Sequence, residues 1–417
     1  MSVIINYFHK AKWSLPAIAI LFLVNACKKE NLSSPVVTGL RAISPAPNDS
    51  TLTRVIPGQI VVIKGYNLNG LQQVLFDGYQ ASVNTALNTN GTIVITVPSG
   101  ILFTSLSADV ANTIKVITTH GETVYKFDVV PPPPVITSIS NEFAHGGDTI
   151  TITGSYLYTV QSVIFPGDNT VSSGFISDST GASLQVIVPN GITPGDADSL
   201  VVETEGGTGK AAFNNTYGMI ADFEWGSPTF GWQYWGGIMG SDAAKFPDGW
   251  GNYIEINPTG TINANDNSWW TNNRAVMIAG SAWVVNGGDP VTNYALKFQM
   301  FVKDPWTNGS LMITTSAQKE NGNSLVSKYV ARYAPEEQTS SGIFQTNGWI
   351  TVTIPLSEIK STDDGGNYDA SGSPAPTMSD LMGGSSSVLQ MMLFNDSSSP
   401  LSSFDAAFDN VRIVKIK

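Results

Sequence analysis

The sequence Gly58-Gln-Ile-Val-Val-Ile-Lys-Gly65-Tyr-Asn-Leu68 recurs 89 residues further along as Gly147-Asp-Thr-Ile-Thr-Ile-Thr-Gly154-Ser-Tyr-Leu157. The similarity continues downstream, and a Val-Pro-x-Gly segment returns in both copies at residues 97–100 and 188–191. An internal repeat of this length indicates two copies of one structural unit. Each copy contains β-branched runs that end at glycine or proline, which is the pattern of short strands. The repeat therefore predicts two consecutive β domains.

The strand and turn pattern indicates the architecture of each copy. About ninety residues of antiparallel strands, with a turn every 8–12 residues or so, are typical of an immunoglobulin-like sandwich. The copies also resemble the IPT/TIG family, whose Pro-x-Ile-x-x-Ile start is matched by residues 134–139 and whose Gly-x-x-Leu turn is matched by residues 65–68. We place the two domains at residues 35–130 and 135–217, with the proline run 131–134 as an extended spacer between them. The resemblance implies that both domains act mainly as spacers in a surface protein.

The N-terminus has the pattern of a bacterial lipoprotein. Residues 1–26 contain a basic segment and then an apolar run, residues 13–24, that is too short to span a bilayer, as in a signal peptide. The chain's single cysteine, Cys27, ends the segment Val24-Asn25-Ala26-Cys27, which resembles a lipobox. The resemblance implies that Cys27 is lipidated and that residues 27–34 are a tether, and several acyl chains hold a protein stably in a membrane. We therefore expect a protein anchored in the lipid of the outer membrane and facing the cell exterior; an ordinary signal peptide with a chance cysteine is the alternative.

The remaining residues, 218–417, continue to show strand patterns and predict one larger jelly-roll-like β-sandwich. The predicted strands include Tyr294–Val302, Leu311–Thr315, Trp349–Ile354, Val388–Phe394 and Phe408–Val414. The expected fold class is thus all-β, with two immunoglobulin-like sandwiches followed by a larger jelly-roll-like sandwich.

The two ends of this last domain resemble those of carbohydrate-binding jelly rolls. It opens with Ile220-Ala-Asp-Phe-Glu224 and closes with Phe408-Asp-Asn-Val-Arg-Ile413. In some of these modules carboxylates from the two strands hold a structural calcium ion, but calcium takes about six to eight oxygen ligands. Glu224 and Asp409 would supply only part of such a set. Carboxylates that are exposed or capped by hydrogen bonds are the alternative, and we predict no metal and no cofactor.

Aromatic side chains are concentrated in the last domain, because nine of the ten tryptophans follow residue 220. The apolar face of a sugar ring stacks on an aromatic ring while its hydroxyls bind polar neighbours. Trp269 and Trp270 lie in an asparagine-rich segment, residues 263–273, and exposed aromatics on polar loops are candidates for binding. Other candidates lie next to glycine or in turn sequences. The predicted glycan-binding residues are Tyr234, Trp235, Trp269, Trp270 and Trp306, whereas Trp232 and Trp283 have apolar neighbours and are assigned to the core.

The arrangement as a whole resembles the surface glycan-binding lipoproteins of Bacteroidetes polysaccharide-utilisation loci, whose best-defined branch binds xyloglucan. In that family an aromatic platform in the last domain carries the glycan, and it combines adjacent aromatics with a tryptophan some thirty-odd residues earlier. Trp269-Trp270 and Trp235 match this spacing. The resemblance implies a non-catalytic protein that captures xyloglucan or another plant-type polysaccharide, with an outer-membrane glycan transporter as a partner.

The charge of the chain limits the other functions. The formal net charge of −12 excludes nucleic acid as a partner, because phosphate binding requires clustered lysine and arginine. No catalytic signature is present and no catalytic residue is predicted. Two alternatives stay open from the residues alone: a surface glycoside hydrolase or lyase, which would need two carboxylates facing a cleft, and a protein-binding adhesin that uses the same aromatics.

Overall fold

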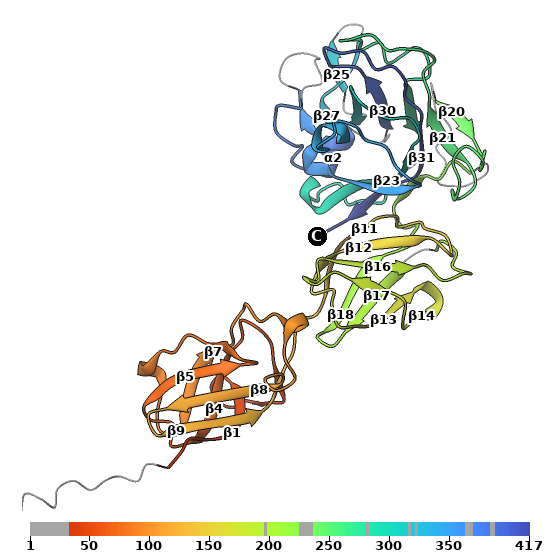
Figure 1. Cartoon of the computed structure of the whole chain (residues 1–417). Helices are drawn as coiled ribbons and strands as arrows, with labels where there is room; N and C mark the ends of the chain where they lie inside the picture. Colours follow the sequence, from red (N-terminus) through yellow and green to blue (C-terminus); the bar gives the residue numbers. More distant parts are fainter. Residues whose placement is uncertain are drawn as a thin grey trace, which may run out of the picture. The chain divides into compact units, whose positions relative to one another are not determined.

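The computed structural model describes residues 33–195, 198–224, 237–279, 283–315, 318–321, 324–362, 370–383 and 388–417. The chain forms two compact units, Met1–Pro131 and Pro132–Lys417 (Figure 1). Strands dominate both units, which confirms the all-β fold class. The described helices are the short α2 (Met378–Met382) and six single 3₁₀ turns, namely Thr85–Leu87, Phe103–Ser105, Pro166–Asp168, Val291–Asn293, Pro335–Gln338 and Leu356–Glu358. None of the helices in the described ranges is long and apolar enough to cross a membrane.

The first unit is a sandwich of two antiparallel sheets. One sheet has the order β2 (Thr51–Leu52), β1 (Val36–Ala42), β4 (Ile60–Tyr66) and β7 (Thr92–Thr96), and the other the order β6 (Tyr79–Gln80), β5 (Leu71–Phe76), β8 (Thr113–Thr118) and β9 (Gly121–Lys126). The short strands β3 (Arg54–Val55) and β10 (Asp128–Val129) pair in parallel. Alternate residues of the long strands, such as Val61 and Ile63, are buried between the sheets, as period-two patterning predicts.

The second unit begins with a sandwich of the same kind. Its sheets have the orders β11 (Val135–Ile139), β12 (Thr149–Ser155), β16 (Ser183–Ile187), β15 (Ile176–Ser177) and β14 (Asn169–Val171), β13 (Val160–Phe165), β17 (Ser199–Thr204), β18 (Gly207–Ala212). The repeated glycine of the two copies has the same structural reason in each. A Cβ at Gly65 would lie 2.0 Å from the Val36 carbonyl oxygen, and one at Gly154 would lie 1.9 Å from that of Val135. The neighbouring strand is bulged at this point in both copies, so its backbone approaches closely and excludes a side chain.

The rest of the second unit is a larger two-sheet sandwich. Its first sheet has the order β20 (Ile238–Gly240), β21 (Tyr253–Ile256), β31 (Ala406–Lys415), β23 (Tyr294–Val302) and β28 (Ile350–Pro355), with β19 (Met219–Ala221) also paired to β31. The second has the order β22 (Ala275–Ala279), β30 (Val388–Phe394), β24 (Ser310–Thr315), β27 (Tyr329–Tyr333) and β29 (Lys360–Ser361). A separate hairpin joins β25 (Gln318–Asn321) to β26 (Ser324–Ser327).

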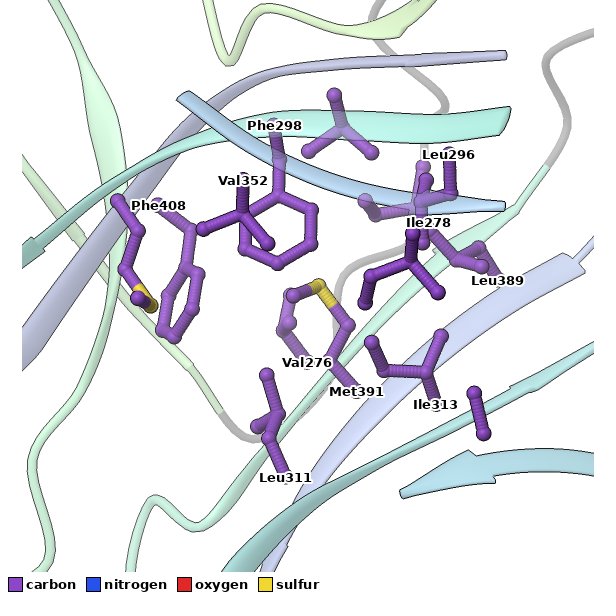
Figure 2. Packing of buried hydrophobic residues seen from close by; sticks show 14 of the residues in the cluster. Val276, Ile278, Leu296, Phe298, Leu311, Ile313, Val352, Leu389, Met391 and Phe408 are labelled. Carbon is purple, nitrogen blue, oxygen red and sulfur yellow. The ribbon is translucent and has the colours of Figure 1, made fainter. Parts of the chain in front are cut away.

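A continuous apolar core lies between these two sheets. Figure 2 shows Leu296 and Phe298 of one sheet packed in the same cluster as Ile313 and Met391 of the other. Trp283 belongs to this core at 8% exposure, which confirms its assignment to packing. The two sheets therefore pack on one shared core, and the loops of the domain connect their strands.

The second immunoglobulin-like sandwich makes a buried polar contact with the larger sandwich within the same compact unit. Glu142, 4% exposed, pairs with Arg412 of β31 at 2.9 Å and with Lys297 of β23. The Arg412 guanidinium lies over the Phe143 ring, 4.6 Å from its centroid. Backbone links accompany the ion pair, because Thr351 donates its N–H to the Ser140 carbonyl at 2.8 Å. These contacts join the two sandwiches through buried ion pairs and a backbone hydrogen bond, although the Nε of Arg412 is buried without a hydrogen-bond partner.

Candidate functional site

Part of the outer face of the second sheet carries a group of apolar side chains. Met392 of β30 lies opposite Ala275 of β22 on one side and Met312 of β24 on the other. These residues are buried together with Val330 and Phe394 in a cluster separate from the main core. Trp269 packs against this cluster. The loop that carries Trp269 therefore covers the outer face of the sheet and is supported by it.

A buried arginine holds this loop in place. The Arg274 guanidinium, 2% exposed, donates to the Asp266 carboxylate at 3.0 Å and to the Asp266 carbonyl at 2.6 Å. Its Nε also donates to the carbonyl of Leu393 in β30 at 3.2 Å. Burial raises the pKa of Asp266, but hydrogen bonds from Ser268 and the charge of Arg274 outweigh burial and hold the pKa below its usual range. Asp266 is therefore ionised at neutral pH and fixes the loop directly before the two tryptophans.

The two indole rings differ in exposure and orientation. Trp270 is 58% exposed, whereas Trp269 is half-buried beneath it. Their centroids are 5.9 Å apart and their planes meet at 84°, an edge-to-face contact. Because the rings are nearly perpendicular, they cannot both lie flat against one straight ligand. Trp270 thus offers a free ring face, and Trp269 acts first as its support.

Trp306 was expected on this platform, and that prediction is wrong. Its side chain is fully buried in the main core, where its ring packs edge-to-face on Phe404 at 5.0 Å. The indole N–H is satisfied by the Asn308 carbonyl at 2.9 Å. The segment is polar in sequence, but a backbone pairing of Trp306 with Phe344 turns the indole inward. Tyr234, Trp235 and Cys27 lie outside the described residues, so their roles stay predictions.

Polar side chains beside the loop were not among the glycan-binding residues predicted from the sequence. Arg332 of β27 donates two hydrogen bonds to Glu337, at 2.7 and 3.0 Å, and one to Asp396 at 2.6 Å. We call Arg332, Glu337 and Asp396 the polar rim. The alternation in Tyr329–Tyr333, where Tyr329 and Ala331 face the core, could have indicated that Arg332 points outward. Its partners, from a loop and from the end of another strand, carried no such signal.

The carboxylates at the ends of the domain are capped by hydrogen bonds. Glu224 accepts from the backbone N–H of Asn252 at 2.6 Å and from its side-chain amide at 3.1 Å. Asp409 is 2% exposed, accepts from the Asn410 N–H at 2.7 Å, and has its pKa raised by burial, with Asp222 and Glu224 adding to the rise. Within the described ranges, no group of three or more histidine, cysteine, aspartate and glutamate residues is arranged to hold a metal ion. The observed geometry is that of capped carboxylates.

Two parts of this chain match models of known protein families. Residues 213–415 match the family model described as the surface glycan-binding protein B xyloglucan binding domain. The C-terminal domain matches this family model over nearly its whole length. Residues 134–217 match the IPT/TIG domain model. Both resemblances seen in the sequence are thereby confirmed, and the matched family is one of binding domains, in agreement with the expectation of a non-catalytic protein.

Individual proteins resemble this chain in sequence or in fold. An IPT/TIG domain-containing protein of Bacteroides ovatus is 30% identical over 177 residues, which cover 42% of this chain and 36% of that relative, so the chain matches about a third of the relative's length. The crystal structure of a surface glycan-binding protein B from Prevotella bryantii superposes with a TM-score of 0.66 at 24% identity, covering 92% of this chain and 99% of that one. A second structure, from a complex xyloglucan utilization locus in Bacteroides uniformis, has a TM-score of 0.49 at 19% identity and covers 92% and 100%. The Prevotella bryantii structure shows that the fold extends over nearly the whole chain.

Proposed function

We propose that this protein captures a neutral plant-type polysaccharide, with xyloglucan as the first candidate, at the bacterial surface and without cleaving it. The observation that carries the proposal is Trp270, an exposed indole on a loop whose base is held by the buried Arg274, paired with the partly exposed Asp266. A rigid aromatic face loses little conformational entropy when it binds, and pre-organisation of this kind improves affinity. The match of the C-terminal domain to the model of a xyloglucan-binding domain supports the choice of ligand.

The neighbourhood of Trp270 suits a ligand rich in hydroxyl groups. Its loop carries several asparagines, and Asn263, Asn265 and Asn267 are exposed. Asn272, at the end of the loop, is fixed by a mutual side-chain and backbone exchange with Thr259, at 2.8 to 3.0 Å. Amides can both donate to and accept from sugar hydroxyls. In this proposal Trp270 stacks on a sugar ring, Trp269 supports it, and Trp235 extends the platform.

We further propose how the protein is attached to the membrane and which role each part of the chain has. Lipidation of Cys27 would anchor the protein in the outer membrane, and an outer-membrane glycan transporter would receive the captured glycan. Residues 35–130 and 135–217 would be the two immunoglobulin-like domains, separated by the prolines 131–134, and residues 218–417 the glycan-binding domain. The matches to surface-protein and IPT/TIG families support this organisation.

Calorimetry with the soluble chain lacking residues 1–34 tests the proposal. We expect saturable binding to xyloglucan in a panel that also contains mixed-linkage β-glucan, mannan and xylan, together with no release of reducing sugar. Release of reducing sugar would identify a hydrolase. Failure to bind any glycan in the panel would contradict the proposed function and favour a protein ligand.

A further inference from the structure

The polar rim lies directly beside the loop that carries Trp270. The segment containing Asp396 runs alongside that loop, because the Asn265 N–H donates to the Ser397 carbonyl at 3.0 Å and the Asn395 N–H donates to the Asp266 carbonyl at 3.1 Å. The Asn395 side chain is buried, with its amide donating to the Ile262 carbonyl at 3.2 Å. Asp396 instead extends its carboxylate to Arg332. Its position thus connects the loop to the outer face of the sheet.

Strand register places Arg332 on the same face as the tryptophan loop. Arg332 is directly opposite Met312 in the pairing of β24 with β27. Met312 belongs to the outer-face cluster against which Trp269 packs. Residues directly opposite each other in an antiparallel pair project to the same side of the sheet. Arg332 and the tryptophan pair therefore share one face of the domain.

The rim is both exposed and held in a fixed geometry. The side chains of Arg332, Glu337 and Asp396 are 31%, 58% and 26% exposed. The paired hydrogen bonds from Arg332 orient the Glu337 carboxylate and hold its pKa below the usual range. Oδ1 of Asp396 is buried without a hydrogen-bond partner, so a ligand can reach only Oδ2 of Asp396 and the oxygens of Glu337. Each of these oxygens accepts from Arg332 and has a further lone pair with which to accept from a ligand. The rim is a set of oriented, charged acceptors next to an aromatic face.

We propose that the polar rim distinguishes neutral sugars from acidic sugars. Glu337 and Asp396 accept hydrogen bonds from neighbouring hydroxyls of a neutral sugar residue, which is adjacent to the sugar residue stacked on Trp270. The same two carboxylates repel sugars that carry carboxylates. This inference rests on the proposed function and names the residues that select a neutral sugar over an acidic one. Two carboxylates against one guanidinium leave the rim with net negative charge. A uronic acid placed there would face like charges, which selects against a partner, whereas vicinal hydroxyls satisfy both acceptors.

The test compares Glu337→Gln and Asp396→Asn with the unaltered chain by calorimetry. The two probes are a xylogluco-oligosaccharide and the same oligosaccharide oxidised to carry carboxylates. Loss of a hydrogen bond to a charged acceptor corresponds to roughly ten- to a hundredfold weaker binding. We expect each variant to bind the neutral probe more weakly by such a factor and to discriminate less against the oxidised probe.

A matched control removes a carboxylate of similar exposure from the first unit. Glu122 is 57% exposed and pairs with Lys115 at 2.9 Å, so Glu122→Gln makes the same change of charge far along the chain from the rim. This variant should bind both probes as the unaltered chain does. If Trp270→Ala weakens binding while both rim variants bind like the control, the rim inference is wrong and the proposed function stands. If Trp270→Ala also binds normally, the proposed site itself is wrong.

Discussion

Arg412 donates a hydrogen bond through Nη2 to Glu142 at 2.9 Å, across a separation of 270 residues in the chain. Both side chains are buried, and Lys297 approaches the other oxygen of the same carboxylate. Burial lowers the pKa of Arg412, and the charge of Glu142 opposes that effect. The second immunoglobulin-like sandwich therefore supplies the counter-ion of an arginine in the central strand of the larger sandwich.

Removal of this counter-ion should destabilise the second unit strongly. Glu142→Ala leaves Arg412 charged, buried and without its carboxylate, and breaking a buried pair in this way costs about 3–5 kcal/mol. Thermal and urea unfolding measure the loss. The double variant Glu142→Ala with Arg412→Leu should recover part of it, because no uncompensated charge remains. Glu122→Gln, in an exposed pair, should cost less than about 1 kcal/mol. Equal loss in the single and double variants would contradict the role given to the ion pair.

Substitution of Trp270 and substitution of Trp269 should affect glycan affinity and protein stability differently. Trp270→Ala removes an exposed ring, so we expect an unchanged melting temperature. Aromatic stacking on nucleobases contributes about 1–3 kcal/mol per ring, and a similar range for a sugar ring corresponds to about five- to a hundredfold weaker binding. Trp269→Ala should reduce both quantities, because Trp269 also packs on the outer-face cluster. Calorimetry and thermal melting of both variants check this, and a Trp270→Ala protein that melts early but binds normally would count against the site.

Trp306 should show the opposite behaviour. Trp306→Ala opens a large cavity in the main core, and such a truncation costs about 3–5 kcal/mol. We expect a marked fall in melting temperature and normal xyloglucan affinity at temperatures where the variant remains folded. A variant that is stable yet binds poorly would restore Trp306 to the platform.

Glu336, next to the polar rim, should make stability depend on pH. Burial raises its pKa to about 7 from an ordinary value of 4.5. Between these values the folded protein holds a proton that the unfolded chain has lost, so stability falls as pH rises from about 4.5 to about 7. Relative to Glu336→Gln, the unaltered chain should lose at most about 3 kcal/mol across this window. Glu337→Gln should reduce this slope without abolishing it, because burial is the main cause of the raised pKa of Glu336 and the charge of Glu337 adds to it. An unaltered slope in Glu336→Gln, measured by urea unfolding at several pH values, would refute the assignment.

Cys27 should decide membrane attachment. Acyl chains contribute about 0.8 kcal/mol per buried CH₂, so loss of all of them removes the anchor that we propose. Cys27→Ala should move the protein from the membrane fraction to the soluble fraction after a carbonate wash. Retention of the variant in the washed membranes would show that another part of the protein holds it there.

Much of the fold could be predicted from local patterns in the sequence. The predicted strands Tyr294–Val302 and Val388–Phe394 coincide with β23 and β30, because alternation and turn residues are local signals. The repeat was visible because Gly65 and Gly154 both face a backbone too close for a side chain.

The parts that were missed depend on contacts between distant residues. Trp306 lies in a polar segment that was predicted to be a turn, but the residue forms a β-bridge with Phe344, and this pairing sets the direction of its indole. The polar rim joins Arg332 to Asp396 across 64 residues, and no local pattern identifies which acid an arginine will meet. The second copy was predicted to act mainly as a spacer, and its contact with the larger sandwich through Glu142 was not predicted, because Glu142 and Arg412 are 270 residues apart in the chain.

The buried contact between Glu142 and Arg412 also determines how the C-terminal domain can be fused to other proteins. A fusion that transplants residues 218–417 onto another scaffold would leave Arg412 without its partner and would expose the Phe143-facing side of its guanidinium to water. A cassette that begins at Pro132 keeps the carboxylate, the aromatic ring and the arginine together, in agreement with the limits of the compact unit. For protein engineering, and for gene shuffling in nature, the transferable module is therefore the sandwich pair.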